Sequence, residues 1–458
     1  MALTSSDSNA QTWSSGWTFI LAAVGAAVGL GNIWRFPYVV GENGGAAFIL
    51  VYVLCVVFVA IPILIGELMI GRRGSNSPPR AMASVAKEAG RSNLWTLVAW
   101  LGLAAGFLIA TYYSVIAGWT LAYIPKALGG YGGATAADVG MQFDALQANP
   151  KAMIGWHSLF IIITMTIVGR GLHGGIEKAV TVLMPALFAM LLLMIGYAAV
   201  AGDFAAGLKF LFSADFSKID SGSVLMAIGQ AFFSIGVAMG LMMVYGAYVP
   251  KTVSLTRSAI IIASADTLVA LLAGLMIFPL VFANELATDA GPSLIFRTLP
   301  AAFVDMPGGT IFGSLFFLLL AFAAVTSLIA LIEPLVAYAI DKWGLTRRNA
   351  CIGVGALAWT IGLGSVVSFN VWSDVTPLAM FPLFDDMTIY GLIDYFTANV
   401  FMPLGGILIA LFVGWRMQVS ILPEELPLMG PAVFQVWLWM IRVVAPLAIV
   451  GVMYQTFA

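Results

Sequence analysis

Charged side chains are scarce in this chain of 458 residues, and their scarcity decides its class. Only 9% of the residues are charged and 61% are hydrophobic, whereas soluble domains carry roughly 25% charged residues. The net charge of −2 provides no basic surface, so a nucleic-acid partner is not expected. This composition predicts an integral membrane protein that lies in contact with the lipid bilayer.

Cysteine and histidine are also rare, which excludes several kinds of site. Cys55 and Cys351 each lie inside an apolar run, so neither a disulfide framework nor a metal site is expected. His157 and His173 lie at or near the ends of apolar segments, and no nucleophile stands beside a base. The sequence therefore predicts that the protein is not an enzyme. Residues 1–16 lack the basic start of a signal peptide, so we expect the first span to direct insertion.

Long apolar segments, each able to cross a membrane, follow one another along the chain. We predict eleven spans, near residues 17–40, 44–70, 94–125, 153–169, 176–201, 224–249, 257–283, 309–340, 349–371, 389–415 and 432–457. With the N-terminus inside, most Lys and Arg residues between the spans fall in inner loops, as the positive-inside rule requires. We therefore expect a multi-pass protein of the inner (plasma) membrane, with a cytoplasmic N-terminus and an extracytoplasmic C-terminus.

Two of these segments contain glycine where an ordinary span would be continuous. In the first, the stretch AAVGAAVGLGNIWRFP (22–37) has three glycines followed by an asparagine and an arginine. In the sixth, Ser234, Gly236 and Gly240 follow a helical run that ends at Phe233. Glycine destabilises a helix by about 1 kcal/mol relative to alanine, and an opened backbone within the membrane is tolerated where it lines a cavity. Both segments are predicted to be broken helices whose free backbone groups bind a ligand.

Broken first and sixth spans are typical of transporters built from two inverted repeats, with a binding site near the membrane midplane. The alternative is that these small residues simply let helices pack closely. The predicted fold is an all-α integral membrane protein with an inverted five-plus-five helix repeat. Its predicted parts are an N-terminal segment (1–16), a first repeat (17–201), an extracellular loop (202–223), a second repeat (224–416), and an inner loop with the eleventh helix (417–458).

Three segments resemble one family, the neurotransmitter:sodium symporters. They are GLGNIWRFPYVVGENGGAAF (29–48), GQAFFSIG (229–236) and FAAVTSLIALIEP (322–334), and the resemblance runs from about Trp13 to Tyr454. It implies the leucine-transporter-type fold and sodium-coupled import by alternating access, with a monomer sufficient for transport. With eleven spans, the chain is similar to the shorter bacterial members of the family.

The resemblance also implies two sodium sites. Site one would use Ala27, Asn32, Ser234 and Asp266, and site two would use Gly25, Val28, Ala323, Thr326 and Ser327. An ionisable group such as Asp266 within a span costs at least about 2.5 kcal/mol, so a functional role is expected. Family members commonly carry asparagine there and animal members add chloride, so this carboxylate implies that chloride is not required, although Gln230 and Tyr52 match other chloride-site positions. For the two hydroxyls of site two, the alternative is a hydrogen bond to the preceding turn of their own helix.

An opened helix offers backbone amides to a carboxylate, in the manner of a helix N-terminus. The resemblance implies a substrate site formed by Ala27, Leu30, Gly31, Ile109, Tyr113, Phe233, Ser234, Gly236, Met239, Ser327 and Leu331. Amine transporters of the family place an aspartate at the position of Gly29, so glycine favours a substrate with its own carboxylate. We predict a large aliphatic or aromatic L-amino acid. The alternatives are a small zwitterion such as glycine, alanine or an osmolyte, and an amino-acid sensor on the same scaffold.

The resemblance implies one gate on each side of the site. Arg35 would pair with Asp394 on the outer side, while Trp13 and Asp341 match the inner gate. Ala10 stands where the family has an arginine, so Asp341 is expected to lack its usual partner. The inner gate is then expected to be weak, and the protein to rest inward-open more readily than its relatives.

The segments between the spans also have predicted roles. The outer loops 126–152, 202–223 and 284–308 are predicted to be lids, and the basic inner loop 71–91 a solvated surface helix. Gly175 and Pro185 match a family motif that lets the fifth span unwind, although an ordinary membrane proline fits as well.

Overall fold

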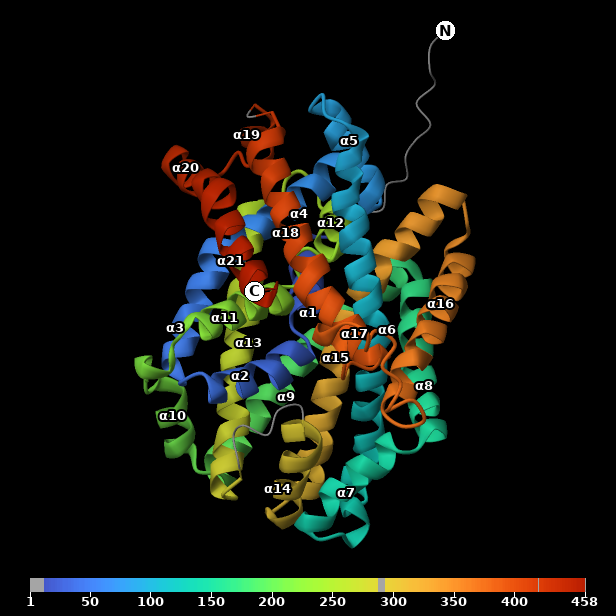
Figure 1. The fold of residues 1–458 in the computed structure, drawn as a ribbon, viewed down its shortest axis with the longest axis vertical. Helices are drawn as coiled ribbons and strands as arrows, with labels where there is room; N and C mark the ends of the chain where they lie inside the picture. The colour runs from blue at the N-terminus through green and yellow to red at the C-terminus, as the bar shows by residue number, and fades with distance from the viewer. Residues whose placement is uncertain (1–11, 287–292, 419, 458) are drawn as a thin grey trace.

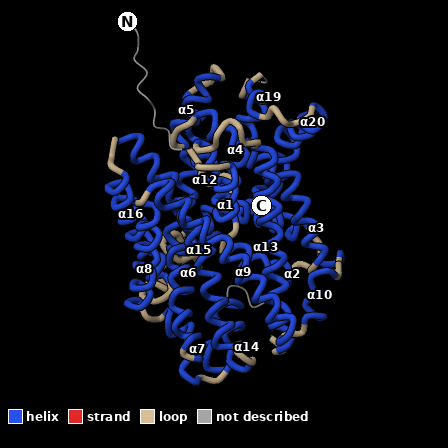
Figure 2. Tube along the Cα trace, turned by 180° about the vertical axis from the view of Figure 1, so that it is seen from behind, coloured by secondary structure: helices blue, strands red, loops and turns tan. Residues whose placement is uncertain are grey.

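A computed structural model of the chain describes residues 12–286, 293–418 and 420–457. Helices make up the fold, and the described residues contain no strand, only one isolated bridge between Gly45 and Ala214 (Figure 2). The α-helices are α1 (Gly16–Ala27), α2 (Phe36–Glu42), α3 (Ala46–Cys55), α4 (Ile61–Gly74), α5 (Pro78–Glu88), α6 (Thr96–Leu128), α7 (Ala136–Gln147), α8 (Pro150–Gly169), α9 (Lys178–Ala201), α10 (Phe204–Phe212), α11 (Ser221–Ile235), α12 (Leu241–Ala247), α13 (Leu255–Ala283), α14 (Leu299–Asp305), α15 (Gly309–Trp343), α16 (Arg347–Ser368), α17 (Ile389–Phe396), α18 (Met402–Leu411), α19 (Ile421–Glu425), α20 (Pro431–Trp439) and α21 (Ala445–Phe457).

Apolar helices of membrane-spanning length dominate the described residues. Nine are continuous: Ala46–Gly74, Asn93–Leu128, Pro150–Gly169, Leu172–Ala201, Leu255–Ala283, Gly309–Trp343, Arg347–Ser368, Ile389–Arg416 and Pro431–Gln455. A tenth is a bent pair, Gly16–Ala27 with Gly31–Gly41, whose halves meet at 57°. The short helices α11 and α12 supply the remaining segment. The eleven spans expected from hydropathy are therefore all found as helices.

The first break lies where the glycines predict it. Helix α1 begins after Ser15, whose side chain accepts a hydrogen bond from the Thr18 N–H, and it ends at Ala27. Val28 is extended, with φ −68° and ψ 103°, and a π-helical turn, η1 (Gly31–Arg35), then leads into α2. The backbone between Ala27 and Gly31 is thus free to hydrogen-bond with partners other than its own helix.

The second break joins α11 to α12. Gly236 ends α11 with φ +73° and Gly240 precedes α12 with φ +75°, a left-handed conformation that glycine adopts without steric cost. Ala238 lies between them with φ +63°, which costs a non-glycine residue about 1–2 kcal/mol. Its N–H donates to Oε2 of the buried Glu67 at 3.1 Å, so α4 holds the opened backbone in place.

Both breaks lie inside the bundle, beside the long helices α6 and α15. Helix α1 contacts α15, α13 and α9, while α11 contacts η1 and α13. The short helices α5 and α19 lie at one end of the molecule, and α7 and α14 lie at the opposite end (Figure 1, Figure 2). The two opened backbones are therefore brought together near mid-depth, between two ends covered by short loop helices.

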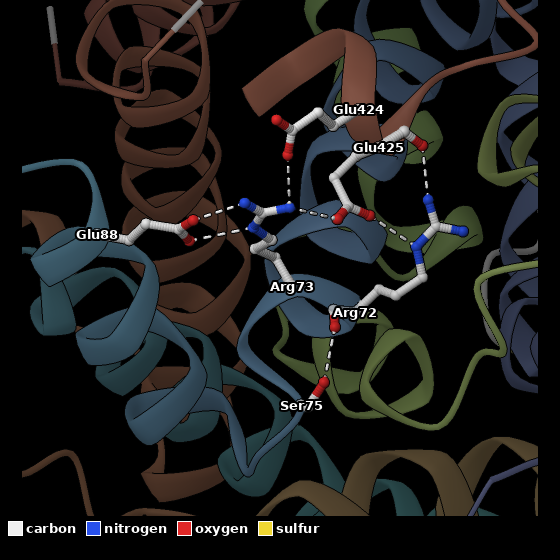
Figure 3. Close-up of polar contacts among 6 residues, drawn as sticks. All are labelled: Arg72, Arg73, Ser75, Glu88, Glu424 and Glu425. Atoms are coloured by element: carbon white, nitrogen blue, oxygen red, sulfur yellow. Dashed lines mark hydrogen bonds and ion pairs between the residues drawn. The ribbon is translucent and has the colours of Figure 1, made fainter. Parts of the chain in front are cut away.

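The basic segment 71–91 differs from its predicted role as a solvated helix. Helix α5 forms as expected, but Arg72 is buried and its Nε lies 2.8 Å from Oε2 of Glu425 in α19 (Figure 3). Arg73 bonds Glu88, Glu424 and Glu425 in the same cluster, and its guanidinium lowers the pKa of the Glu88 carboxyl. Two of the basic residues thus join α4 to a loop helix far along the chain, Arg72 as a buried side chain and Arg73 as a half-buried one.

Candidate functional site

A buried carboxylate, Asp266 of α13, lies at the centre of one polar cluster. Asn32 Nδ2 donates to Asp266 Oδ1 at 2.7 Å, and Ser234 Oγ donates to Asp266 Oδ2 at 2.7 Å. The Tyr52 hydroxyl donates to the same Oδ2 at 3.3 Å. None of the ion pairs among the described residues includes Asp266. A buried charge requires compensation, and these hard oxygen atoms suit a sodium ion.

Hydroxyls of α15 face the opened end of α1 in a second cluster. Ser327 Oγ donates to the Gly25 carbonyl at 3.4 Å and to the Val28 carbonyl at 3.3 Å. Thr326 Oγ1 bonds back to the Ala323 carbonyl at 3.0 Å, as the alternative for these hydroxyls predicted. Ser327, by contrast, reaches across to another helix. Ser327 and the Gly25 and Val28 carbonyls therefore place oxygen atoms between α1 and α15, which fits a sodium ion, whereas Thr326 and Ala323 bond to each other within α15.

A small cavity of about 30 Å³ lies between these clusters. Its lining comprises Ala26, Ala27, Gly29, Gly31, Ile109, Tyr113, Phe233, Ser234, Gly236, Met239, Leu241, Ser327 and Leu331. All the predicted substrate residues except Leu30 are among them. The cavity combines one tyrosine hydroxyl and opened backbone with an apolar wall.

Close contacts on α1 explain the glycine at the centre of this cavity. A methyl group at Gly29 would lie 2.6 Å from Ser327 Oγ and 3.0 Å from the Tyr113 hydroxyl. The Leu30 N–H donates to that hydroxyl at 3.1 Å, so this amide, predicted to bind a carboxylate, has a protein partner here. The sequence singled out Gly29 but did not place it in the cavity, and nothing in the sequence pointed to Ala26 or Leu241.

Phe233 separates this cavity from an outer one of about 210 Å³. Leu30, Arg35 and Asp394 line the outer cavity, so the two predicted gate charges face one space. No ion pair joins Arg35 to Asp394 among the described residues; the Arg35 guanidinium carbon lies 5.3 Å from the Phe233 ring centroid. The two residues predicted to form the outer gate therefore line one cavity but are not bonded to each other.

Trp13, which is predicted to belong to the inner gate, packs against the C-terminal part of α12. Its backbone N–H donates to the Tyr248 carbonyl at 2.9 Å and its indole N–H donates to the Tyr245 carbonyl at 3.1 Å. Asp341 accepts a hydrogen bond from the Ser77 backbone N–H at 2.8 Å. The start of α5 thus gives Asp341 a neutral backbone partner in place of the family's arginine, so the prediction that it lacks its usual partner stays a prediction. Ala10 lies outside the described residues.

Two buried glutamates near Trp13 are not among the residues predicted from the sequence. Glu333 of α15 accepts from the Tyr248 hydroxyl at 3.1 Å and pairs with Arg347 at 2.5 Å. Glu177 accepts from the Ser14 N–H at 2.7 Å, just before α1. Glu333 could have been found in the sequence, because an ionisable residue inside a span is expected to be functional. Glu67 is a third ionisable residue inside a span, and it could have been found in the same way.

The fifth span is irregular where its predicted motif begins. A π-helical segment, η5 (Leu172–Glu177), contains Gly175 and leads directly into α9, while Pro185 lies inside α9. Next to this proline, the Met184 sulfur would lie 2.8 Å from a methyl group at Gly25. The irregular start of the fifth span and the second cluster are therefore joined through α9.

Comparison with known proteins shows which family and which solved structure this chain resembles. The model of the "Sodium:neurotransmitter symporter family" matches residues 10–131 and 149–458. The uncharacterised sodium-dependent transporter YhdH of Bacillus subtilis is 38% identical over 442 residues, covering 96% of each chain. A sodium-dependent transporter of Haemophilus influenzae is 30% identical, covering 98% of each. The crystal structure of MhsT in complex with L-phenylalanine is similar with a TM-score of 0.89 and 40% identity, covering 98% of this chain and all of that one.

Proposed function

Because the chain belongs to the sodium:neurotransmitter symporter family, we propose that it imports a large aliphatic or aromatic L-amino acid together with sodium. The protein is a sodium-dependent, multi-pass membrane symporter with the leucine-transporter-type fold, and it is a transporter, not an enzyme. Our proposal concerns the identity of the substrate, the number of sodium ions and the gates.

The observation that carries the substrate proposal is the composition of the inner cavity. Ile109, Phe233, Met239 and Leu331 form its apolar wall, and Gly236 adds no side chain to the lining. Methionine adapts its shape to different apolar partners, so the wall suits a range of large side chains. The similar protein MhsT was crystallised with L-phenylalanine, which supports this class of substrate.

Two sodium ions are proposed, one at each cluster. Asp266, Asn32, Ser234 and the Ala27 carbonyl would hold the first, beside the carboxylate of the substrate. Gly25, Val28, Ala323, Thr326 and Ser327 would hold the second. Sodium supplies positive charge that compensates both carboxylates, so bound substrate and bound ion stabilise each other.

The Tyr113 hydroxyl would bind the substrate carboxylate with the backbone of Leu30 and Gly31. For this, the Leu30 N–H must exchange its present bond to Tyr113 for one to the substrate. The carbonyls of Ala27, Phe233 and Ser234, three residues that line the cavity, would accept from the ammonium group. Both ends of the amino acid would then be bound by opened backbone.

Alternating access follows from the two gates. Phe233, Arg35 and Asp394 would close the outer side, while Trp13 and Asp341 would close the inner side. In the described structure Trp13 is bonded to α12, whereas the outer cavity remains open above Phe233. We propose that the N-terminus is cytoplasmic, that the C-terminus is extracytoplasmic in the inner membrane, that the two repeats span 17–201 and 224–416, and that a monomer suffices.

Uptake into proteoliposomes tests the proposal. With an inward sodium gradient, labelled phenylalanine should accumulate, and competition by all twenty amino acids should rank the large apolar ones first. Strong competition by glycine or alanine alone would favour a small zwitterionic substrate. Binding of phenylalanine without sodium-driven accumulation would mean that the protein is a sensor.

A further inference from the structure

An open groove of about 650 Å³ lies at the end of the molecule where α1 begins. Its lining comprises Gly16, Trp17, Ile20, Thr252, Val253, Ser254, Thr256, Arg257, Ser258, Ile260, Ile261 and Leu428. These residues come from α1, from the loop between α12 and α13, from the first turns of α13 and from the segment after α19. The groove is therefore separate from the two cavities that the transport proposal uses.

One wall of the groove consists of large apolar side chains that are exposed. Trp17 is 64% exposed, Ile260 is 48% exposed and Leu428 is 77% exposed. Trp17 and Ile260 lie in the first two turns of helices that belong to two spans, and tryptophan is enriched at the membrane–water interface, which would place these exposed side chains against lipid. This wall suits an acyl chain.

The mouth of the groove carries a cation. Arg257 is exposed and takes part in none of the ion pairs among the described residues. Thr252 and Thr256 line the same groove, and no carboxylate is part of its lining. A guanidinium with neighbouring hydroxyls is the arrangement that binds a phosphate group.

The Arg72 cluster fixes the shape of this groove. Arg72 Nη1 donates to the Val253 carbonyl at 2.7 Å. Arg72 Nη2 donates to the Glu425 carbonyl at 2.6 Å, and this second bond is drawn in Figure 3. The loop before α13 and the segment that leads to Leu428 are thus both held by one buried side chain. A preformed groove loses less conformational freedom when a ligand binds.

From these observations we propose that the groove binds an anionic phospholipid of the inner leaflet. Its phosphate contacts Arg257, and an acyl chain packs along Trp17, Ile20 and Ile260. Anionic lipids are favoured over zwitterionic ones because the lining has a cation and no carboxylate. The assignment to the inner leaflet rests on the proposed orientation of the chain, whereas lipid binding itself does not. A lipid in this position joins α1 to α13 and stabilises the packed position of α1.

Retention of lipid by the purified protein tests this site. The full chain is placed in nanodiscs of phosphatidylcholine with phosphatidylglycerol, which offer both lipids on both faces, and is then released into native mass spectrometry. Wild type should retain phosphatidylglycerol over phosphatidylcholine, and Arg257→Gln should lose most of that preference, several-fold. Arg257→Lys should keep it. Arg80→Gln removes an exposed cation of α5 outside the groove and should behave as wild type.

Three results would overturn the proposal. Equal retention by Arg257→Gln and wild type would remove the headgroup contact. Equal loss in Arg80→Gln and Arg257→Gln would mean attraction to the whole basic face. Displacement of the lipid from wild type by millimolar glycerol 3-phosphate would indicate a site for a soluble phosphate instead of a lipid. Sodium-dependent phenylalanine binding, measured on each variant, reports separately on the proposed transport function.

Discussion

At the scale of single residues, the clearest consequences follow from buried oxygen atoms that pair with no Lys or Arg side chain among the described residues. Asp266 is buried, and its three hydrogen-bond donors are all neutral side chains. A negative charge at this place would make a bound chloride unnecessary. Wild-type uptake should therefore be the same in sodium gluconate and in sodium chloride.

Replacement of this carboxylate tests the same charge. Asp266→Asn should lose transport or acquire a requirement for chloride, because the amide provides no countercharge to the ion. Asp374→Asn, on an exposed outer loop, is the matched control and should transport as wild type. Full uptake by Asp266→Asn without chloride would show that the charge is not needed.

The hydroxyls of the second cluster give a prediction about sodium affinity. Thr326→Val combined with Ser327→Ala removes two oxygen ligands and should raise the sodium concentration at half-saturation roughly tenfold, if about 1.4 kcal/mol of ion binding is lost. Thr360→Val is the control, since Thr360 bonds only to the preceding turn of α16 on the exposed surface. Scintillation-proximity binding across a sodium titration measures this midpoint. An unchanged midpoint in the double variant would mean that the hydroxyls only bond to backbone.

Much of this site could be predicted from motifs, because the glycines, Asp266 and the paired hydroxyls depart from an apolar background. The partners of Arg72 and Asp341 could not. Arg72 and Glu425 lie 353 positions apart, and each alone reads as an ordinary loop charge. Likewise, the bond from Ser77 to Asp341 depends on where α5 docks, which no local pattern specifies.

At the scale of elements, the break between α11 and α12 contains one residue in an unfavourable conformation. Ala238→Gly should remove the cost of its left-handed backbone and stabilise the fold by up to about 1 kcal/mol, less the added freedom of the unfolded chain. Ala231→Gly, inside α11, is the control and should destabilise by about 1 kcal/mol or more. Unfolding followed by circular dichroism in detergent compares the two.

A loss of stability in Ala238→Gly would point to side-chain packing instead. The Ala238 methyl faces Gly405 of α18, where a methyl group would lie 3.3 Å away.

The spans themselves were predictable to within a few residues because hydropathy is a local property. The π-helical segments, such as η5, were not, because they depend on the neighbours that a helix meets.

At the scale of the whole molecule, the Arg72 cluster joins α4 to α19, in the loop that precedes the last membrane-spanning helix. Glu425→Gln leaves a buried guanidinium without its countercharge and should destabilise the protein by roughly 3–5 kcal/mol. Glu424→Gln, whose side chain is 59% exposed, should change stability by no more than about 1 kcal/mol. Thermal unfolding of the two variants provides the measurement, and equal effects would contradict a structural role for the buried pair.

The bonds from Ser327 to the Gly25 and Val28 carbonyls also bear on the heat of binding. A sodium ion at this place exchanges two long hydrogen bonds for ion–oxygen contacts, and it covers almost no apolar surface. Its binding should therefore have a heat-capacity change near zero. An amino acid entering the apolar cavity should instead give a clearly negative one, because it removes apolar surface from water. Isothermal titration at several temperatures would then distinguish the two binding events on one sample, without any label.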